Sequence, residues 1–317
     1  MFTPLFLPTG SYNLTDLALR NNILAGTVLA VAAVIIWSGN FIAARGIINH
    51  VPPVTLAFYR WLTASLILLP FGWNKLVAEK QVILQNKQYF FWIALSGVTL
   101  FNTFVYIAAH HVPAINLALI GTTLSPVFAI ILAAVFLKET VRPLRLTGLL
   151  LCIGGIILLL SQGSWQRLQS LHFTRGDGWI VAAAFTFAVY TILVRRKPPG
   201  ISPVSFLLAV FTIGTLLLTP WFIYEQTSTP SVQWNSKLLL VILYLGAGTS
   251  VTAFLCWNLA IARLGAARTA LFGNLIPVFS SLEAVWILHE EITWLHGISS
   301  VLVLAGLLLA NMRKANP

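Results

Sequence analysis

Charged residues are scarce in this sequence, and aspartate is almost absent from it. Charged side chains make up 9% of the 317 residues, whereas a soluble domain carries about 25%. So small a share cannot cover a water-facing surface, which excludes an ordinary soluble globular protein. The only aspartates, Asp16 and Asp177, lie outside the long apolar segments. An enzyme with paired catalytic aspartates inside the membrane is therefore excluded as well.

Cysteine frameworks, zinc motifs and nucleotide motifs are also missing. The two cysteines, Cys152 and Cys256, both fall inside apolar segments, so they indicate neither a disulfide framework nor a zinc site. The sequence contains no His-Glu-x-x-His motif and no Gly-Lys-Ser/Thr phosphate loop. We therefore expect no metal, no cofactor and no catalytic residues.

The sequence indicates neither a nucleic-acid site nor a signal peptide. The formal net charge of +11 would suit nucleic acid only if Lys and Arg were clustered on one exposed face, but they lie between apolar runs. We expect no nucleic-acid partner. The first 20 residues lack a basic region and a small-residue cleavage site after an apolar stretch, so no signal peptide is expected.

Long apolar runs dominate the sequence. Hydrophobic residues make up 58% of the chain, and about 20 consecutive apolar residues cross a bilayer as a helix. The sequence predicts an all-α integral membrane protein with ten transmembrane helices, a multi-pass protein of the cell membrane and specifically of a bacterial inner membrane. The predicted helices cover residues 23–44, 54–72, 89–109, 114–137, 144–161, 178–195, 203–223, 237–262, 267–288 and 292–311.

Basic residues are distributed unevenly between the two sides that ten helices define. With both termini in the cytoplasm, the inner segments hold 14 Lys and Arg residues and the outer segments hold 4. The positive-inside rule therefore predicts cytoplasmic N and C termini. The inner basic residues are Arg20, Lys75, Lys80, Lys87, Lys138, Arg142, Arg145, Arg195, Arg196, Lys197, Arg263, Arg268, Arg313 and Lys314, and the outer ones are Arg45, Arg167, Arg175 and Lys237.

The chain contains an internal repeat. At an offset of 150 residues, Pro53 and Pro70 align with Pro203 and Pro220. At offsets of 151 and 152 residues the match extends to short identical or similar segments. These are Ala118-Leu119-Ile120-Gly121 against Ala270-Leu271-Phe272-Gly273, and Pro126-Val127-Phe128 against Pro277-Val278-Phe279.

The repeat predicts two halves of opposite orientation. Because each half has five helices, the second half enters the membrane from the other side, which makes the two halves inverted repeats. We expect a cytoplasmic segment over residues 1–22, a first five-helix repeat over 23–165 and a second over 176–312. Inverted repeats are typical of transporters that expose a central site alternately to either side. A duplication without such motion is the structural alternative.

These repeated segments resemble the drug/metabolite transporter superfamily, and within it the ten-helix EamA exporter family. The resemblance is carried by Trp37-Ser38-Gly39-Asn40-Phe41, by Phe58-Tyr59-Arg60 and by the two Pro-Val-Phe segments. It covers residues 23 to 311. It implies a carrier that exports amino acids, related metabolites or amphipathic drugs without ATP. It also implies a central cavity lined by helices one, three, four, six, eight and nine.

Two charged residues lie within predicted helices, where charge is costly and by default functional. Arg60 lies about 10 Å into helix two from its outer end, and Glu283 lies at a similar depth in helix nine. Neither has a charged counterpart, because Val210 and Leu132 occupy the equivalent positions. The hypotheses are a gate, a proton-linked switch or anchors for an amino acid. The alternative is a structural ion pair.

Polar and aromatic residues on the implied lining helices are the other substrate-binding candidates. Each of them alone also fits helix packing, because small polar residues commonly join membrane helices. Pro126 and Pro277, at matching places in helices four and nine, are candidate hinges or static bends. The full substrate-binding set is Trp37, Asn40, Asn102, Tyr106, Thr122, Tyr190, Trp257, Asn258, Asn274 and Glu283.

The sequence therefore predicts a transporter, secondary active or facilitative, that exports small metabolites by alternating access. A channel-like facilitator and an uptake permease are alternatives, and an intramembrane enzyme is less favoured. The expected partners are a small-molecule substrate, the lipid bilayer and protons as a candidate coupling ion, with the chain a monomer or a weak homodimer.

Overall fold

The computed structural model describes residues 14–45, 51–111, 114–169, 176–229, 232–288 and 294–312. Every regular element within those ranges is helical. The first half comprises α1 (Leu14–Arg45), α2 (Pro53–Ala78), α3 (Lys80–Gln85), α4 (Lys87–Ala94), η1 (Leu95–Leu100), α5 (Phe101–His111), α6 (Ala114–Leu137), α7 (Pro143–Ser161) and α8 (Trp165–Gln169). The second half comprises α9 (Asp177–Arg195), α10 (Pro203–Ser228), α11 (Ser236–Tyr244), η2 (Leu245–Thr252), α12 (Ala253–Leu264), α13 (Ala266–Leu271), η3 (Phe272–Leu275), α14 (Ile276–Leu288) and α15 (Trp294–Asn311).

The all-α membrane fold is confirmed. Nine helices of the described residues are long and apolar enough to cross a bilayer. The ninth predicted helix, 267–288, is not among the nine and is built from α13, η3 and α14, so a short 3-10 turn interrupts it. The count of ten spans and the cytoplasmic termini stay predictions. Of the predicted N-terminal segment 1–22, residues 1–13 lie outside the described part of the chain, and α1 already begins at Leu14.

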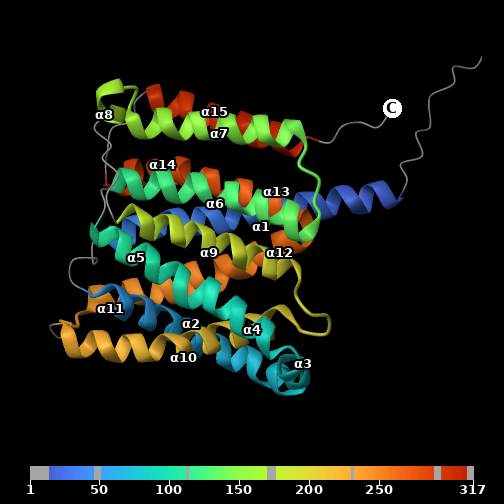
Figure 1. Ribbon diagram of the computed structural model, residues 1–317, viewed down its shortest axis with the longest axis vertical. Coiled ribbons are helices and arrows are strands. Elements are labelled where there is room, and N and C mark those ends of the chain that lie inside the picture. Colours follow the sequence, from blue (N-terminus) through green and yellow to red (C-terminus); the bar gives the residue numbers. More distant parts are fainter. Residues whose placement is uncertain are drawn as a thin grey trace, which may run out of the picture.

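The two halves pack as inverted copies. Equivalent helices pair with each other at the two edges of the bundle, α7 with α15 and α2 with α10. In both pairs the helices run antiparallel, as the ribbon shows (Figure 1). Between these edges, α6 and α5 of the first half both pack on α9 of the second half. Their equivalents in the second half, α14 and α12, both pack on α1, which is the equivalent of α9. The start of α1 and the end of α15 lie at the same end of the bundle (Figure 1).

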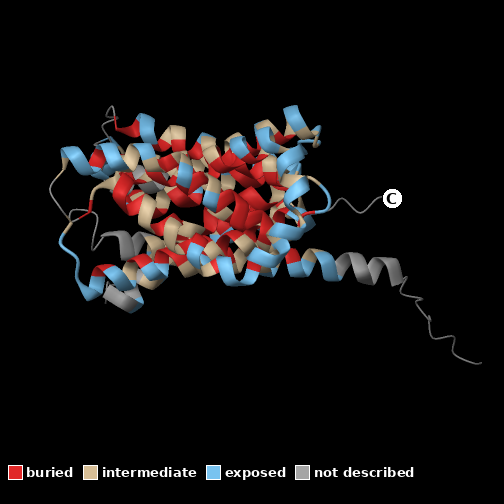
Figure 2. Cartoon of the chain, turned by 90° about the horizontal axis from the view of Figure 1, so that it is seen from below, coloured by how far each residue is buried: buried red, intermediate tan, exposed pale blue. Residues whose placement is uncertain are grey.

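Burial follows the expectation for a protein surrounded by lipid. The buried side chains gather in the middle of the bundle and the exposed ones lie on its outside (Figure 2). Many exposed side chains are large and apolar, among them Leu66, Phe71 and Leu150. Because lipid replaces water around the helices, such side chains need no protein partner.

Small residues allow the α7–α15 pair to approach closely. A Cβ atom at Gly306 would lie 2.5 Å from the carbonyl oxygen of Gly148, so only glycine fits there. One turn further along α7, the Cys152 thiol lies 3.3 Å from the carbonyl oxygen of Val303. This edge is therefore a tight backbone contact of the kind that small residues make between membrane helices.

Two π-helices occur at equivalent places in the halves. η1 begins at Leu95 and η2 at Leu245, which is the 150-residue offset of the repeat. A π-helix carries an extra residue per turn, and such segments are frequent at functional sites. The apolar runs of the sequence predict the helices that contain η1 and η2 but not the π-turns, because apolar periodicity does not distinguish the two helix types.

Candidate functional site

A cavity lies at the centre of the bundle, between the two halves. Its empty volume is about 850 Å³, including the part that opens to solvent. Its walls come from α1, α2, α5, α6, α9, α12, α13, η3 and α14. The lining residues are Trp37, Asn40, Arg60, Phe101, Asn102, Val105, Gly121, Thr122, Ser125, Pro126, Ile180, Ala184, Phe187, Trp257, Ala270, Gly273 and Ile276.

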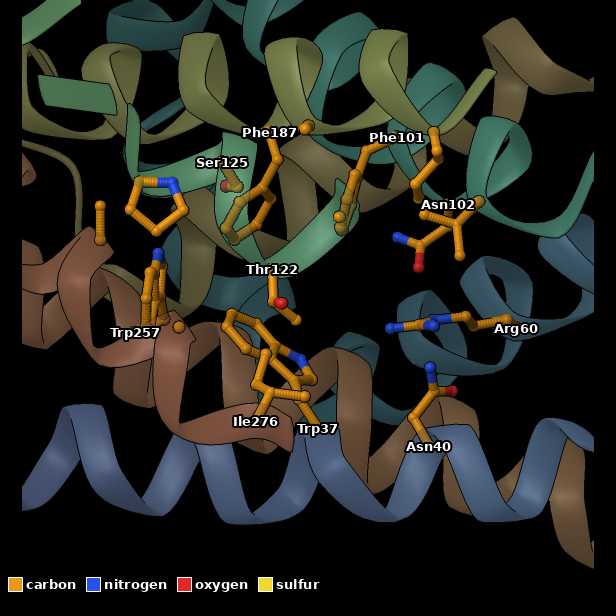
Figure 3. Close-up of a pocket in the computed structure, with 17 residues that line it drawn as sticks. Trp37, Asn40, Arg60, Phe101, Asn102, Thr122, Ser125, Phe187, Trp257 and Ile276 are labelled. Atoms are coloured by element: carbon orange, nitrogen blue, oxygen red, sulfur yellow. The ribbon is translucent and has the colours of Figure 1, made fainter. Parts of the chain in front are cut away.

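The cavity has a polar end and an aromatic end. Arg60 lies between Asn40 and Asn102, with both amides beside the guanidinium (Figure 3). The other end is walled by aromatic rings, and the centroid of Trp37 lies 5.0 Å from that of Trp257 and 5.6 Å from that of Phe187. Such a cavity suits a molecule with a polar group at one end and an apolar body.

The guanidinium of Arg60 is held by neutral groups. Its Nε donates to the Ser250 hydroxyl at 2.7 Å, and its Nη1 donates to the Tyr106 hydroxyl at 2.9 Å. Its Nη2 lies 3.3 Å from the Thr249 carbonyl oxygen, which also accepts from the Trp37 indole at 2.8 Å. Ser250 and Thr249 belong to η2. The π-helix of the second half therefore positions an arginine of the first.

Several polar atoms of the cavity wall have no protein partner. These are Asn40 Oδ1, Asn102 Nδ2 and Trp257 Nε1, each buried and without a hydrogen bond among the described residues. A buried polar atom without a partner costs free energy. Such atoms beside a cavity are suited to a ligand or to water.

Five predicted binding residues do not line the cavity. Tyr106 stands behind Arg60 as its hydrogen-bond acceptor. Tyr190 donates to Asn258 Oδ1 at 2.8 Å, and both lie outside the lining. Asn274 is fully buried and donates to the Leu271 carbonyl at 3.0 Å. Glu283 is the fifth. Trp37, Asn40, Asn102, Thr122 and Trp257 do line the cavity.

Glu283 and Arg60 do not form an ion pair. Glu283 Oε1 lies 2.7 Å from the Ser38 hydroxyl, which lies 2.7 Å from the Ile35 carbonyl oxygen as well. Glu283 Oε2 is buried without a hydrogen-bond partner among the described residues. The single ion pair found in the described ranges joins Arg145 and Glu139, 3.8 Å apart. Arg60 and Glu283 are thus two separate features.

The two candidate hinge prolines have different surroundings. Pro126 lies within α6 and lines the cavity. Pro277 is the second residue of α14 and follows η3, so the backbone changes helix type directly before it. Its neighbour Ile276 reaches the cavity wall.

Sequence reasoning missed the apolar part of the lining. Phe101 and Phe187 form a ring pair with centroids 4.5 Å apart. The pattern in the sequence that could have identified these residues is their helical spacing. Phe101 and Val105 flank Asn102 on one face of α5, and Ile180, Ala184 and Phe187 follow at intervals of four and three on α9. Such spacing identifies a face only after one residue of that face is known to line the cavity.

Two inverted halves of apolar helices with a cavity between them form the architecture of a membrane transporter. The chain belongs to the EamA-like transporter family, which matches residues 24–161 and 174–312. The resemblance to the EamA branch of the drug/metabolite transporters is thereby confirmed. The protein is a multi-pass membrane transporter.

Relatives in several organisms support this assignment. An Archaeoglobus fulgidus protein named as an uncharacterized transporter is 27% identical over 288 residues, covering 90% of this chain and 97% of its own. A probable amino-acid metabolite efflux pump of Escherichia coli strain K12 is 23% identical and covers 88% of this chain and 92% of its own. A solved crystal structure, 21% identical, has a similar fold with a TM-score of 0.74 over 90% of this chain and 96% of that chain.

Proposed function

We propose that this transporter exports small amphipathic metabolites, amino acids or compounds related to them, by alternating access between its two halves. The central cavity carries the proposal. Its polar end at Arg60 and its aromatic end at Trp37, Phe187 and Trp257 match an amphipathic molecule. The E. coli relative supports amino-acid metabolites as the substrate class.

Alternating access requires each half to move against the other. We assign the hinges to Pro126 in α6 and to η3 with Pro277 in the equivalent helix, because both interrupt the helical ladder beside the cavity. The tight α7–α15 edge is too closely packed to open and forms the fixed part of the bundle.

Glu283 is the proposed coupling residue. The Ser38 hydroxyl has one proton and two acceptors at 2.7 Å, the Ile35 carbonyl and Glu283 Oε1. When Glu283 is protonated it can donate to Ser38, and Ser38 then donates to Ile35. When Glu283 is ionised, Ser38 must donate to it. One proton thus changes the bonding between α1 and α14, which gives a carrier a means of coupling transport to protons.

Flux through liposomes tests the carrier mechanism. The purified chain is reconstituted and the uptake of labelled amino acids is measured against concentration, with and without unlabelled substrate inside. We expect saturation and a faster exchange when substrate is present on the other side. Flux that rises in proportion to concentration, with no effect of internal substrate, would instead establish the channel-like alternative. Accumulation in cells with and without the protein decides between export and uptake.

A further inference from the structure

The charge of the cavity wall is one-sided. Arg60 is the only charged residue among the described residues that line it, and no carboxylate joins them. Glu283, which could have offered a negative charge, is bonded to Ser38 and is not part of the lining. A bound molecule therefore meets a cation and no anion.

Arg60 also lacks a counter-ion. Its side chain is 1% exposed, and it makes no ion pair within the described part of the chain. A guanidinium has five N–H donors, and three of its bonds go to Ser250, Tyr106 and the Thr249 carbonyl. One N–H on each terminal nitrogen is left over. With a donor left on each terminal nitrogen, the guanidinium can still bind a carboxylate, whose negative charge Arg60 lacks.

Asn102, beside Arg60, fits the same ligand. Asn102 is 4% exposed as a residue, and its Nδ2 has no hydrogen-bond partner among the described residues. It lies next to the guanidinium on the cavity side (Figure 3). A carboxylate at this place would satisfy a buried donor and supply the missing negative charge at once. An ammonium group there would add a second positive charge, and the unpaired acceptor beside it, Asn40 Oδ1, is a neutral amide oxygen that cannot neutralise that charge.

We propose that the cavity selects amphipathic monocarboxylates, which have an apolar or aromatic tail and no free ammonium group, over zwitterions and amines with the same tail. The carboxylate binds Arg60 and Asn102, and the tail lies among Trp37, Phe187 and Trp257. Within the substrates of the proposed function, on which this inference rests, it favours N-acylated or deaminated amino acids over free amino acids.

Three probes with the same phenylethyl tail test the selectivity. They are 3-phenylpropanoate, phenylalanine and 2-phenylethylamine, which at pH 7 are an anion, a zwitterion and a cation. Calorimetric titration of the purified full chain in detergent gives their Kd values. We expect the acid to bind at least about tenfold more tightly than phenylalanine, the size of a charge-assisted contact, and the amine not to bind. Equal or tighter binding of phenylalanine, binding of the amine or no binding of the acid overturns the proposal.

Variants connect the selectivity to named residues. Arg60→Lys keeps the charge but loses the planar fork, so the acid should bind about tenfold more weakly while the order of the probes is kept. Asn102→Ala should weaken the acid several-fold, whereas Asn86→Ala, outside the cavity, should change nothing. If Arg60→Lys does not fold, as judged by size-exclusion chromatography, Asn102→Ala decides. An unchanged Kd for the acid in Asn102→Ala contradicts the proposed anchor.

Comparing the Kd values with uptake rates distinguishes a failure of the selectivity proposal from a failure of the transport proposal. Uptake of the same three probes into liposomes is measured in parallel. If phenylalanine is transported but the acid is not preferred, the carrier function holds and the selectivity proposal is wrong. If the acid binds with the expected preference but no probe crosses the membrane, the carboxylate site holds and the transport proposal is wrong.

Discussion

Arg60 and Val210 occupy equivalent positions in the two halves, and the π-helix that packs near each of them makes different contacts. Beside Val210, the Thr99 hydroxyl of η1 donates to the Gly214 carbonyl at 3.0 Å. The side chain of Val98 fills the space at Gly214, where a Cβ would lie 2.3 Å from Val98 Cγ1. The residue equivalent to Val98 is Gly248, where a Cβ would meet Tyr244 and Ile36 and no atom of α2. The neighbouring Thr249 and Ser250 instead hold the Arg60 guanidinium.

Glu283→Gln tests proton coupling at a single residue. Glutamine keeps the size of the side chain but cannot exchange a proton, so the rate of transport should lose its dependence on pH between pH 5 and 8. Initial uptake rates into liposomes at each pH measure this. Glu139→Gln, at the end of the bundle beside Arg145, is the matched control and should behave as wild type. A Glu283→Gln variant that follows the wild-type pH profile contradicts the coupling role.

At the scale of elements, α2 and α10 cap each other. The carboxylate of Glu225, at the end of α10, accepts from the Val54 and Thr55 amides at 3.1 and 2.6 Å at the start of α2. In the other direction, Glu79 after α2 accepts from the Ser202 amide at 2.9 Å, directly before α10. Each carboxylate satisfies amides that a helix start leaves without partners and also meets the positive end of the helix dipole.

Removing these caps should lower stability to different extents. Glu225 is buried and accepts a third bond from the Thr55 hydroxyl at 2.8 Å, so Glu225→Gln should cost about 2 kcal/mol. Glu79 is partly exposed, and Glu79→Gln should cost about 1 kcal/mol. Thermal unfolding in detergent would give a lower Tm for both, with the larger shift for Glu225. An equal Tm for Glu225→Gln and wild type would show that the cap is not stabilising.

The positions of the helices could be predicted from the sequence, whereas the side of each helix that faces the cavity mostly could not. Both ends of α6 match the predicted range 114–137, because an apolar run of bilayer length lies between Pro113 and Lys138 in the sequence. α1 begins nine residues before its predicted start, since Leu14–Asn22 is helical without being apolar throughout. Asn102 and Tyr106 are one turn apart on α5, yet only Asn102 lines the cavity. In a helix that is apolar on all sides, no polar face marks the direction of the cavity.

At the scale of the molecule, the two edges of the bundle are self-complementary. Gly148 and Gly155 of α7 are equivalent to Ser299 and Gly306 of α15. Gly148 meets Gly306, and Gly155 meets Ser299, whose carbonyl oxygen lies 3.0 Å from the position of a Cβ at Gly155. Each contact is therefore the copy of the other. The caps of α2 and α10 are reciprocal without being copies, because Glu79 aligns with Thr229 and Glu225 with Lys75 at the 150-residue offset.

Self-complementary edges predict that the halves assemble as separate chains. If residues 1–169 and 170–317 are expressed together with a tag on one of them, the two pieces should co-purify from membranes and bind the same ligands as the intact chain. Gly148→Leu in the first piece should abolish co-purification, because leucine cannot fit against Gly306. Its matched control is Gly154→Leu, since Gly154 has no atom within 4 Å of its Cβ position. Pieces that never co-purify would refute the prediction.

The antiparallel pairing of α7 with α15 and of α2 with α10 also bears on how such a chain can have arisen. A lone five-helix unit with these edges would dimerise with an inverted copy of itself, and in that dimer every substitution would occur twice. An arginine at the position of Arg60 would then place two like charges around one cavity. Duplication of the gene removes that constraint, because each copy then mutates alone, and fusion fixes the two copies in one chain. The charge asymmetry of the site is thus a property that a symmetric dimer of one gene product could not have.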